Sequence, residues 1–445
     1  MNISDSERIA GFLELHKLKP AENINEANLV IFNTCGVRQM AEDRVFGQIH
    51  NLTRNTQHET RSKFIVLTGC LANRKDVHKR LKDKVDLFFP INEFDKFENW
   101  IFENFLNPPA GGENCKLKIP AQLNNTNYSN YLSIVPKYTN KHTAYVPVMT
   151  GCNNFCAYCV VPYARGREIS RPAEEIISEI KGLIKNGCKE IILLGQNVNS
   201  YNHVTYNTKH VTITPFPKLL KMIEKIPGKF WISFMSSHPK DYSDELIDVI
   251  AKSKKICEMV HLPLQAGDDK ILEKMNRKYT KKHYLSLVKK IKFAFKKYKP
   301  ETLYSITTDI IVGFPGETKK QFLESADVMK KVKYDMVFFG QFSPRPGTAA
   351  YKLTDNVSKA EKVKRENFLN EILKKTNLAN NKKYVGKVLE VIIDKFEAKP
   401  QVYFARTRTG KHMRIESKKK DLVGQFAKVK ITKANIWNLE GEITK

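Results

Sequence analysis

The feature that most constrains the fold is an alternation of short apolar runs with helical stretches between residues 144 and 339. Amphipathic segments separate the runs, as at 177–184, where Gly187 is placed to end the helix. Repeated β/α units build parallel sheets, so we expect a partial or complete TIM-like barrel with its ligand site at the carboxyl ends of the strands. Six runs have the length and composition of strands: 144–149, 190–194, 230–234, 259–264, 304–312 and 336–339.

A shorter version of the same alternation opens the chain. Two apolar runs end at Cys35 and Cys70, a third covers 85–90, and helical spacing fills the gaps. This order predicts a doubly wound parallel sheet with both cysteines at strand ends, where ligands collect. Before the first run lies an amphipathic helix with Ser4 or Ser6 as its predicted N-cap. No strand precedes that helix, although a helix that opens an α/β domain normally follows one.

The C-terminal region changes character again. Short alternating runs broken by Gly and Lys cover 384–394, 402–410, 411–417 and 426–432, and they predict a small antiparallel β-barrel. The expected fold class is therefore α/β: a doubly wound N-terminal sheet, a central TIM-like partial barrel and a small C-terminal β-barrel. The predicted domains are 1–110, a linker rich in Pro, Gly and Asn at 111–141, the barrel at 142–375 and the small barrel at 376–445.

Charge indicates the kind of partner. The chain has 75 Lys and Arg against 47 Asp and Glu, a net charge of +28. Such an excess attracts polyanions, so nucleic acid is the expected partner, with a solvated lysine surface as the plain alternative. We expect no membrane partner, because no apolar run approaches the roughly 18 residues of a membrane span. The N-terminus lacks a secretory signal, so we expect a cytoplasmic protein with reduced thiols.

Three of the eight cysteines, Cys152, Cys156 and Cys159, lie directly after the first predicted barrel strand. Zinc sites usually combine two closely spaced pairs of ligands, whereas His142 is the single Cys or His near this triplet that could be a fourth. Three thiolates on a [4Fe–4S] cube leave one iron with an open position. The spacing therefore favours a cluster that binds a further ligand.

This C-x3-C-x2-C spacing, with Tyr158 before the third cysteine, resembles the radical S-adenosylmethionine (SAM) enzymes. Longer stretches resemble the methylthiotransferases nearly end to end: NTCGVRQMAEDRVFGQI, GCNNFCAYCVVPYARGREISRP, LLGQNVNSY, HLPLQAGDDKILEKMNRKYT, TDIIVGFPGET and FFGQFSPRPGTAA. The resemblance implies an N-terminal domain with a second [4Fe–4S] cluster, a radical SAM barrel and a C-terminal TRAM barrel that binds RNA.

The quoted motifs look most like the branch that converts N6-isopentenyladenosine in tRNA, beside the anticodon, to its 2-methylthio form. The implied partners are the tRNA anticodon stem-loop, an electron donor such as flavodoxin or ferredoxin, and a sulfur source. Two alternatives stay open. One is methylthiolation of N6-threonylcarbamoyladenosine in tRNA or of a ribosomal-protein aspartate, and the other is an RNA-binding protein with an inactive auxiliary cluster.

The resemblance also assigns roles to residues. Cys152, Cys156 and Cys159 would hold the cluster that cleaves SAM, and Cys35 and Cys70 would hold the auxiliary cluster. Gly195, Gln196 and Asn197 would lie near the methionine amino group of SAM. The remaining implied SAM contacts are Tyr158, Ser233, Gln265, Val312 and Gly313.

One auxiliary ligand has no counterpart in this sequence. In the family, the first of three auxiliary cysteines precedes Met-Asn in a motif of the form GCQMNxxDSE, whereas this chain starts MNISDSE. The resemblance predicts that the protein starts further upstream, with a strand that ends in Cys-Gln. A protein that begins at Met1 would have two auxiliary thiolates, and methylthiolation would be doubtful.

The basic residues after the cysteine triplet allow two interpretations. Arg165, Arg167 and Arg171 could contact tRNA phosphates or the SAM carboxylate, or they could form a solvated surface. His238 and His261 lie at predicted barrel strands, and each fits a supporting role at the site or a structural role equally well.

Overall fold

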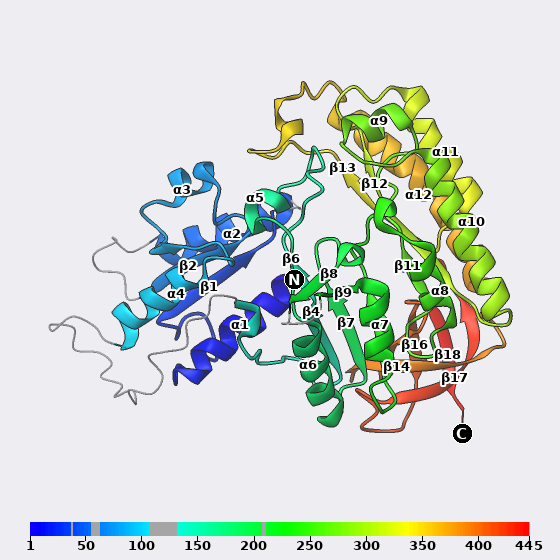
Figure 1. Cartoon of the computed structure of the whole chain (residues 1–445), viewed down its shortest axis with the longest axis horizontal. Helices are drawn as coiled ribbons and strands as arrows, with labels where there is room; N and C mark the ends of the chain where they lie inside the picture. The colour runs from blue at the N-terminus through cyan, green and yellow to red at the C-terminus, as the bar shows by residue number, and fades with distance from the viewer. Residues whose placement is uncertain (37–38, 55–62, 107–130, 207–210, 445) are drawn as a thin grey trace. The chain divides into compact units, whose positions relative to one another are not determined.

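The computed structural model describes residues 1–36, 39–54, 63–106, 131–206 and 211–444 (Figure 1). The chain divides into two compact units. Unit 1 contains Met1–Thr139, Thr150–Glu168 and Arg345–Tyr351; unit 2 contains Asn140–Met149, Ile169–Pro344 and Lys352–Lys445. Most of the predicted linker 111–141 lies outside the described residues, and the predicted domain limits stay a prediction.

Unit 1 contains a three-stranded parallel sheet with helices on both faces. The strand order is β1-β2-β3, where β1 is Leu29–Thr34, β2 is Phe64–Gly69 and β3 is Leu87–Phe88. Alternate residues of β2 enter different cores: Ile65 packs with residues of the second and third helices, and Val66 with residues of the first and fourth. The predicted doubly wound arrangement is therefore confirmed. The helical segments are α1 Asn2–Leu15, α2 Gln39–Thr53, α3 Lys75–Leu81, α4 Phe94–Ile101, η2 Phe102–Leu106, η4 Tyr131–Ser133, α5 Val161–Arg165 and η7 Ala349–Lys352.

The start of α1 differs from the sequence-based expectation. The helix begins at Asn2, its N-cap is Met1, and no side chain caps it. The prediction of Ser4 or Ser6 as N-cap is wrong, because both residues lie inside the helix. Ser4 is buried, so a face that looked polar in the sequence is packed against the rest of the unit.

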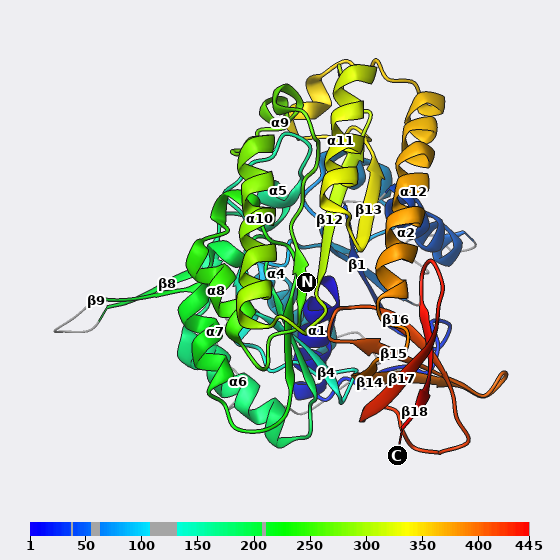
Figure 2. The same cartoon turned by 90° about the vertical axis from the view of Figure 1, so that its right-hand side faces the viewer.

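Six parallel strands form the partial barrel of unit 2, as predicted. They lie in two sheets, β4-β7-β10 and β11-β12-β13, and isolated bridges join Ile232 to Ile256 and Gln265 to Ile310. Helices cover the outside of the strands (Figure 2). The strands are β4 Thr143–Pro147, β7 Glu190–Leu194, β10 Trp231–Phe234, β11 Met259–His261, β12 Ser305–Val312 and β13 Met336–Gln341. The helical segments are α6 Ala173–Lys185, η5 Val198–Ser200, α7 Phe216–Glu224, η6 Pro239–Asp241, α8 Asp244–Lys252, α9 Asp269–Lys274, α10 Lys281–Tyr298, α11 Lys319–Val332 and α12 Lys359–Lys382.

Four short strands were not anticipated. β8 Asn202–Tyr206 and β9 Val211–Pro215 pair antiparallel, and this hairpin projects from unit 2 between β7 and α7 (Figure 2). The two-residue strands β5 Met149–Thr150 and β6 Ile169–Ser170 flank the cysteine triplet in the chain.

The C-terminal segment of unit 2 forms a closed barrel of five strands in the order β14-β15-β16-β18-β17. The predicted small barrel is confirmed. The sequence predicted four of its strands, and the fifth, Leu439–Ile443, was not predicted. The strands are β14 Val388–Glu397, β15 Val402–Thr407, β16 His412–Glu416, β17 Phe426–Ala434 and β18 Leu439–Ile443.

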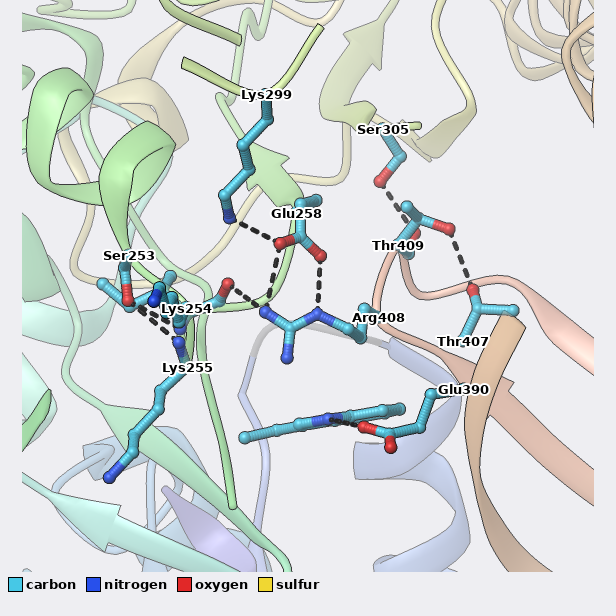
Figure 3. A network of polar contacts seen from close by, with 12 residues as sticks. Ser253, Lys254, Lys255, Glu258, Lys299, Ser305, Glu390, Thr407, Arg408 and Thr409 are labelled. Carbon is cyan, nitrogen blue, oxygen red and sulfur yellow. Dashed lines mark hydrogen bonds and ion pairs between the residues drawn. The ribbon is translucent and has the colours of Figure 1, made fainter. Parts of the chain in front are cut away.

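A network of ion pairs and hydrogen bonds attaches the small barrel to the amino ends of the partial-barrel strands (Figure 3). Glu258, just before β11, accepts a hydrogen bond of 2.7 Å from Nε of Arg408 and one of 2.6 Å from Lys299. Ser305, the first residue of β12, donates to the backbone oxygen of Thr409 at 2.7 Å. The small barrel is thus held at the amino ends, and the carboxyl ends of the six strands lie outside this contact.

Two further pairs extend the same contact. Arg406 donates to Glu190, the first residue of β7, at 2.8 Å, and it also pairs with Asp394 of β14 at 2.7 Å. Lys411 pairs with Asp335, just before β13, at 2.9 Å. Glu190 and Glu258 are almost fully buried, and Arg406 and Arg408 place positive charge beside them.

Candidate functional site

The cysteine triplet lies on a tight loop of unit 1. Gly151, which opens it, has a φ of +75°, and a Cβ at this position would lie 1.9 Å from the backbone oxygen of Arg167. Only glycine fits here. The Cys152 N–H donates to Gly166 at 3.2 Å, and the Cys159 N–H donates to Cys156 at 2.9 Å. The backbone therefore holds all three thiols, with Tyr158, within one turn of chain.

The thiols of the triplet interact electrostatically. Burial raises the pKa of Cys159 to about 12, and charge on Cys156, Cys152 and Cys70 would raise it further. Burial also raises the pKa of Cys152. Thiols of this kind hold their protons until a metal ion replaces them.

Cys35 and Cys70 lie side by side at the ends of neighbouring strands. Thr34 and Gly69 are paired in the sheet, and the Cys70 N–H donates to Thr34 at 3.0 Å. A Cβ on Gly36 would lie 2.9 Å from the Cβ of Cys70, so this side chain is closely surrounded. The structure brings the two predicted auxiliary ligands together; their role as ligands stays a prediction, as does a cysteine upstream of Met1.

A cavity of about 380 Å³ opens beside Cys70 in unit 1. Its walls include Val160 and Tyr163, which follow Cys159 in the chain, together with Arg74 and Pro346. Cys70 also packs directly against Val160. The cavity therefore offers space for a ligand next to one predicted auxiliary thiol and to the chain that leaves the triplet.

Two of the three arginines after the triplet have internal partners. Arg165 is buried and forms an ion pair with Asp5 at 2.5 Å and a hydrogen bond with Asn2 at 3.0 Å. Arg171 is also buried, and it contacts Glu179 and the backbone of Pro147, each at 2.8 Å. Both residues stabilise the fold. Arg167 lies over the Phe155 ring at 4.6 Å.

In unit 2, the residues predicted to hold the amino group of SAM follow β7. A Cβ on Gly195 would lie 2.6 Å from Met149, so the backbone passes very close to that side chain. Asn197 is buried and donates from Nδ2 to Asp241 at 2.7 Å, and its Oδ1 is buried without a hydrogen-bond partner among the described residues. The same holds for Oε1 of Gln196. Both amide oxygens are acceptors.

The other predicted SAM contacts lie on three further strands of unit 2. Ser233 donates to Glu190 at 3.0 Å, toward the amino end of β7. Gln265, with a φ of +65°, exchanges backbone hydrogen bonds with β12. Val312 is buried at the end of β12, and the next residue, Gly313, donates to Glu317 at 2.8 Å. Their contacts with SAM stay a prediction.

The segment after β10 contains polar groups that the sequence did not single out as ligands. Ser237 Oγ and His238 Nε2 are buried without a hydrogen-bond partner in the described part of the chain. Their position at the carboxyl end of a barrel strand was visible in the sequence as SSHP, but their missing partners were not. His261, in contrast, contacts Thr307 at 2.9 Å and Asp309 at 3.4 Å.

The residues present fit the expected cofactors by their chemistry. Three thiols lie on one loop, which suits an iron–sulfur cluster, and buried acceptors suit an ammonium group. Among the described residues, no three His, Cys, Asp or Glu side chains already have the geometry of a metal site. Metal binding itself would draw deprotonated ligands together.

Sequence comparisons agree with this architecture. A family profile described as "Radical SAM superfamily" matches residues 146–329, one described as "Uncharacterized protein family UPF0004" matches residues 1–90, and one described as "TRAM domain" matches residues 382–444. The parallel partial barrel, the cysteine triplet after its first strand and these matches define a radical SAM enzyme.

Full-length relatives identify the family within that class. A tRNA-2-methylthio-N(6)-dimethylallyladenosine synthase of Thermoanaerobacter pseudethanolicus is 40% identical over 100% of this chain and 91% of the relative. A synthase of the same name from Clostridium botulinum is 41% identical over 99% of this chain and 94% of the relative. The chain belongs to the tRNA-2-methylthio-N(6)-dimethylallyladenosine synthase family.

Solved structures show weaker likeness. The radical SAM methyltransferase TsrM of Kitasatospora setae matches 77% of this chain and 68% of its own, with 15% identity and a TM-score of 0.49. At this level the likeness carries no argument about function. No helix in the described ranges is long and apolar enough to cross a membrane.

Proposed function

We propose that this protein converts N6-isopentenyladenosine, beside the anticodon of tRNA, to its 2-methylthio derivative by radical SAM chemistry. The observation that carries the proposal is the 40% identity over the whole chain to synthases named for this product. The cysteine triplet, the small RNA-binding barrel and the net charge of +28 fit the same reaction. The protein is a radical SAM methylthiotransferase with SAM and [4Fe–4S] clusters as cofactors.

Each part of the chain has a defined task in this proposal. Cys152, Cys156 and Cys159 hold the SAM-binding cluster, and Cys35 and Cys70 supply ligands of the auxiliary cluster. Bound SAM and the two clusters supply the radical that removes hydrogen from C2 of the adenine and the sulfur that replaces it.

The protein around these ligands binds and positions the base. The cavity beside Cys70 receives the modified adenine. Gln196 and Asn197 accept hydrogen bonds from the SAM amino group. The small barrel adds RNA contacts away from the reacting base.

The proposal also includes an electron donor, a sulfur source and a cellular compartment. The reducing electron comes from a small carrier such as flavodoxin or ferredoxin, because the cluster has to be reduced before SAM is cleaved. A separate sulfur source replaces the sulfur that is transferred. We place the reaction in the cytoplasm, where tRNA and reduced thiols occur together.

Nucleoside analysis of tRNA tests the proposed function. In a strain that lacks this gene, mass spectrometry of digested tRNA should show loss of the 2-methylthio form and accumulation of N6-isopentenyladenosine. A plasmid with the wild-type gene should restore the product, and a plasmid with Cys152, Cys156 and Cys159 replaced by alanine should not. Loss of methylthio groups from N6-threonylcarbamoyladenosine alone would assign the protein to that substrate instead.

A further inference from the structure

Helix α10, Lys281–Tyr298, is basic along its whole length. It contains seven lysines and no acidic residue. Figure 2 shows the helix on the outside of the partial barrel. One face of the helix is buried, through Tyr284, Leu287, Val288, Ile291, Ala294 and Phe295. These residues recur at helical spacing, so the lysines lie on the two flanks and on the outer face.

A lysine on each flank of α10 has a carboxylate partner on a neighbouring helix. On one flank, Lys281 pairs with Asp327 of α11 at 2.9 Å. On the other flank, Lys290 pairs with Asp244 of α8 at 2.7 Å. The acidic residues of the neighbouring helices thus balance charge at the edges of α10 and leave its outer face positive.

The outer face of α10 carries a line of lysines. Lys282, Lys289 and Lys296 are exposed, and none of them pairs with a carboxylate in the described part of the chain. Their spacing of seven residues is about two helical turns, so all three lie on one side of the helix, opposite the buried face. Ser286 and Phe293 lie between them on the same side, and 68% of Phe293 is exposed. We call these five residues the lysine stripe.

The lysine stripe leads from one end of the partial barrel toward the other. Lys282 and Lys296 are 14 residues apart, which is about 21 Å along a helix. Helix α10 connects the parallel strands β11 and β12 and runs opposite to them, so Lys282 lies toward their carboxyl ends, where such barrels bind ligands. Lys296 lies toward the amino ends. Lys299, just beyond the helix, donates to Glu258, which also binds Arg408 of the small barrel (Figure 3).

The chemistry of the lysine stripe fits RNA. Three aligned cations without carboxylate partners match the regularly spaced negative charges of a phosphate backbone. The exposed ring of Phe293 can stack on an unpaired base. Lysines alone would keep the surface soluble, but solubility does not require an aromatic ring in contact with water. The combination of basic and aromatic side chains is typical of surfaces that bind single-stranded nucleic acid.

We propose that the lysine stripe is a second RNA-binding surface, separate from the small barrel, which binds tRNA away from the reacting base. Lys282, Lys289 and Lys296 contact phosphates, and Phe293 stacks on an unpaired base. That the RNA is tRNA rests on the proposed function, whereas the affinity for a polyanion rests on α10 alone. Two surfaces on unit 2 fix the direction in which the RNA lies along it.

The salt dependence of tRNA binding tests the lysine stripe. In cluster-loaded protein, the triple variant Lys282→Gln, Lys289→Gln and Lys296→Gln should bind labelled, unmodified tRNA at least about tenfold more weakly at about 100 mM salt. Each lost phosphate contact reduces the steepness of log affinity against log salt by about 0.7–0.9, so the total reduction should be about 2 to 3. Fluorescence anisotropy between about 50 and 200 mM salt gives both values.

A second triple variant is the matched control: Lys181→Gln, Lys185→Gln and Lys225→Gln. These lysines are also exposed in unit 2, and their replacement removes the same charge, but they lie on α6 and at the end of α7. The control should reduce the steepness by less than about one. An equal reduction in both triple variants would refute the lysine stripe, because binding would then depend on total charge alone.

Phe293 separates stacking from charge. Phe293→Ala should weaken tRNA binding about tenfold with unchanged steepness, because stacking releases no counterions. Phe293→Trp should bind as tightly as wild type, and wild-type affinity in Phe293→Ala would refute the stacking contact. If the stripe variant binds tRNA normally but its clusters are reduced more slowly by reduced ferredoxin, the proposal is wrong and the surface binds an acidic electron carrier instead.

Failure of the lysine stripe can be told apart from failure of the proposed function. If the stripe variant loses tRNA affinity but the wild-type protein leaves N6-isopentenyladenosine unmodified, the stripe stands and the proposed reaction fails. If the wild-type protein forms the 2-methylthio product and the stripe variant binds tRNA with unchanged steepness, only the stripe fails.

Discussion

At the scale of single residues, the thiols of the triplet are the proposed ligands of the SAM-binding cluster. Burial and neighbouring thiols raise the pKa of Cys159, so this thiol is protonated at neutral pH in the metal-free protein. Each thiol must lose its proton to bind iron. Iron uptake should therefore be faster at mildly alkaline pH, and each cysteine should be indispensable to the cluster.

Replacement of one triplet cysteine gives the first prediction. Cys159→Ala should lose about half of the iron and all detectable 5′-deoxyadenosine formation, because two thiolates do not hold a cube with one open position. Cys188→Ala is the control, since Cys188 donates to the backbone of Glu190 at 3.2 Å and lies outside the triplet. Equal iron in both variants would contradict the assignment.

The buried pair of Arg165 and Asp5 gives a prediction about stability. Arg165→Met would leave the Asp5 carboxylate buried without its cation, at a cost of about 3–5 kcal/mol. The thermal unfolding midpoint should fall by several degrees. Lys252→Met, which removes an exposed pair with Asp248, should change it very little.

His238 gives a prediction about pH. Its folded pKa is lowered to about 2 from the usual 6.5, so the unfolded chain takes up a proton below pH 6.5 that the folded protein does not. The associated stability is complete above pH 6.5, and as pH falls it is lost at up to about 1.4 kcal/mol per unit. Unfolding midpoints of His238→Gln between about pH 7.5 and 5.5 should therefore fall less with acid than those of wild type. Tyr242→Phe should follow wild type, and parallel curves for all three proteins would refute this account.

At the scale of secondary structure elements, the sequence predicted the strands that appear as apolar runs. Each of the six barrel strands was placed within a few residues, because apolar side chains make up at least half of every strand. The hairpin β8–β9 was missed, because its strands are mostly polar, and β18 was missed because Leu439–Ile443 contains two glutamates. The predicted N-cap of α1 was wrong because Ser4 lies inside the helix and is buried, and residue spacing does not reveal such packing.

The candidate site divides in the same way. Spacing alone predicted Cys152, Cys156 and Cys159 as cluster ligands, because a cluster requires its ligands close together in a loop. The buried polar atoms of Ser237 and His238 could not be found from spacing, because the hydrogen-bond partners of an atom depend on what lies around it in three dimensions. Asn199, for example, joins two loops that are 39 residues apart in the chain.

The contact between the small barrel and the partial barrel gives a prediction at this scale. Burial alone would raise the pKa of Glu258, but the hydrogen bonds and charges of Arg408 and Lys299 lower it. Arg408→Ala should therefore destabilise unit 2 by about 2–4 kcal/mol, while the iron content stays normal. Calorimetry of Glu258→Gln with Arg408→Gln should show a smaller loss than Arg408→Ala, because the buried carboxylate is removed and Lys299, its second partner, is only partly buried; a larger loss would contradict the argument.

At the scale of the whole molecule, charge governs the encounter with RNA. A net charge of +28 implies that many phosphates are neutralised on binding, with release of counterions. The affinity for an unmodified tRNA anticodon arm should fall at least about 100-fold between about 50 and 200 mM salt. Fluorescence anisotropy with a labelled arm measures it. An affinity independent of salt would exclude phosphate contacts as the main source of binding.

The attachment of the small barrel has a consequence for protein engineering. Arg406, Arg408 and Lys411 each pair with a carboxylate outside the small barrel, on Glu190, Glu258 and Asp335, although Arg406 also pairs with Asp394 of β14. The TRAM domain therefore depends on contacts with the partial barrel and is not suited to transfer by itself. A chimera in which two homologues exchange this domain must also exchange the three acidic partners. Otherwise the basic residues of the domain would contact a surface without matching carboxylates.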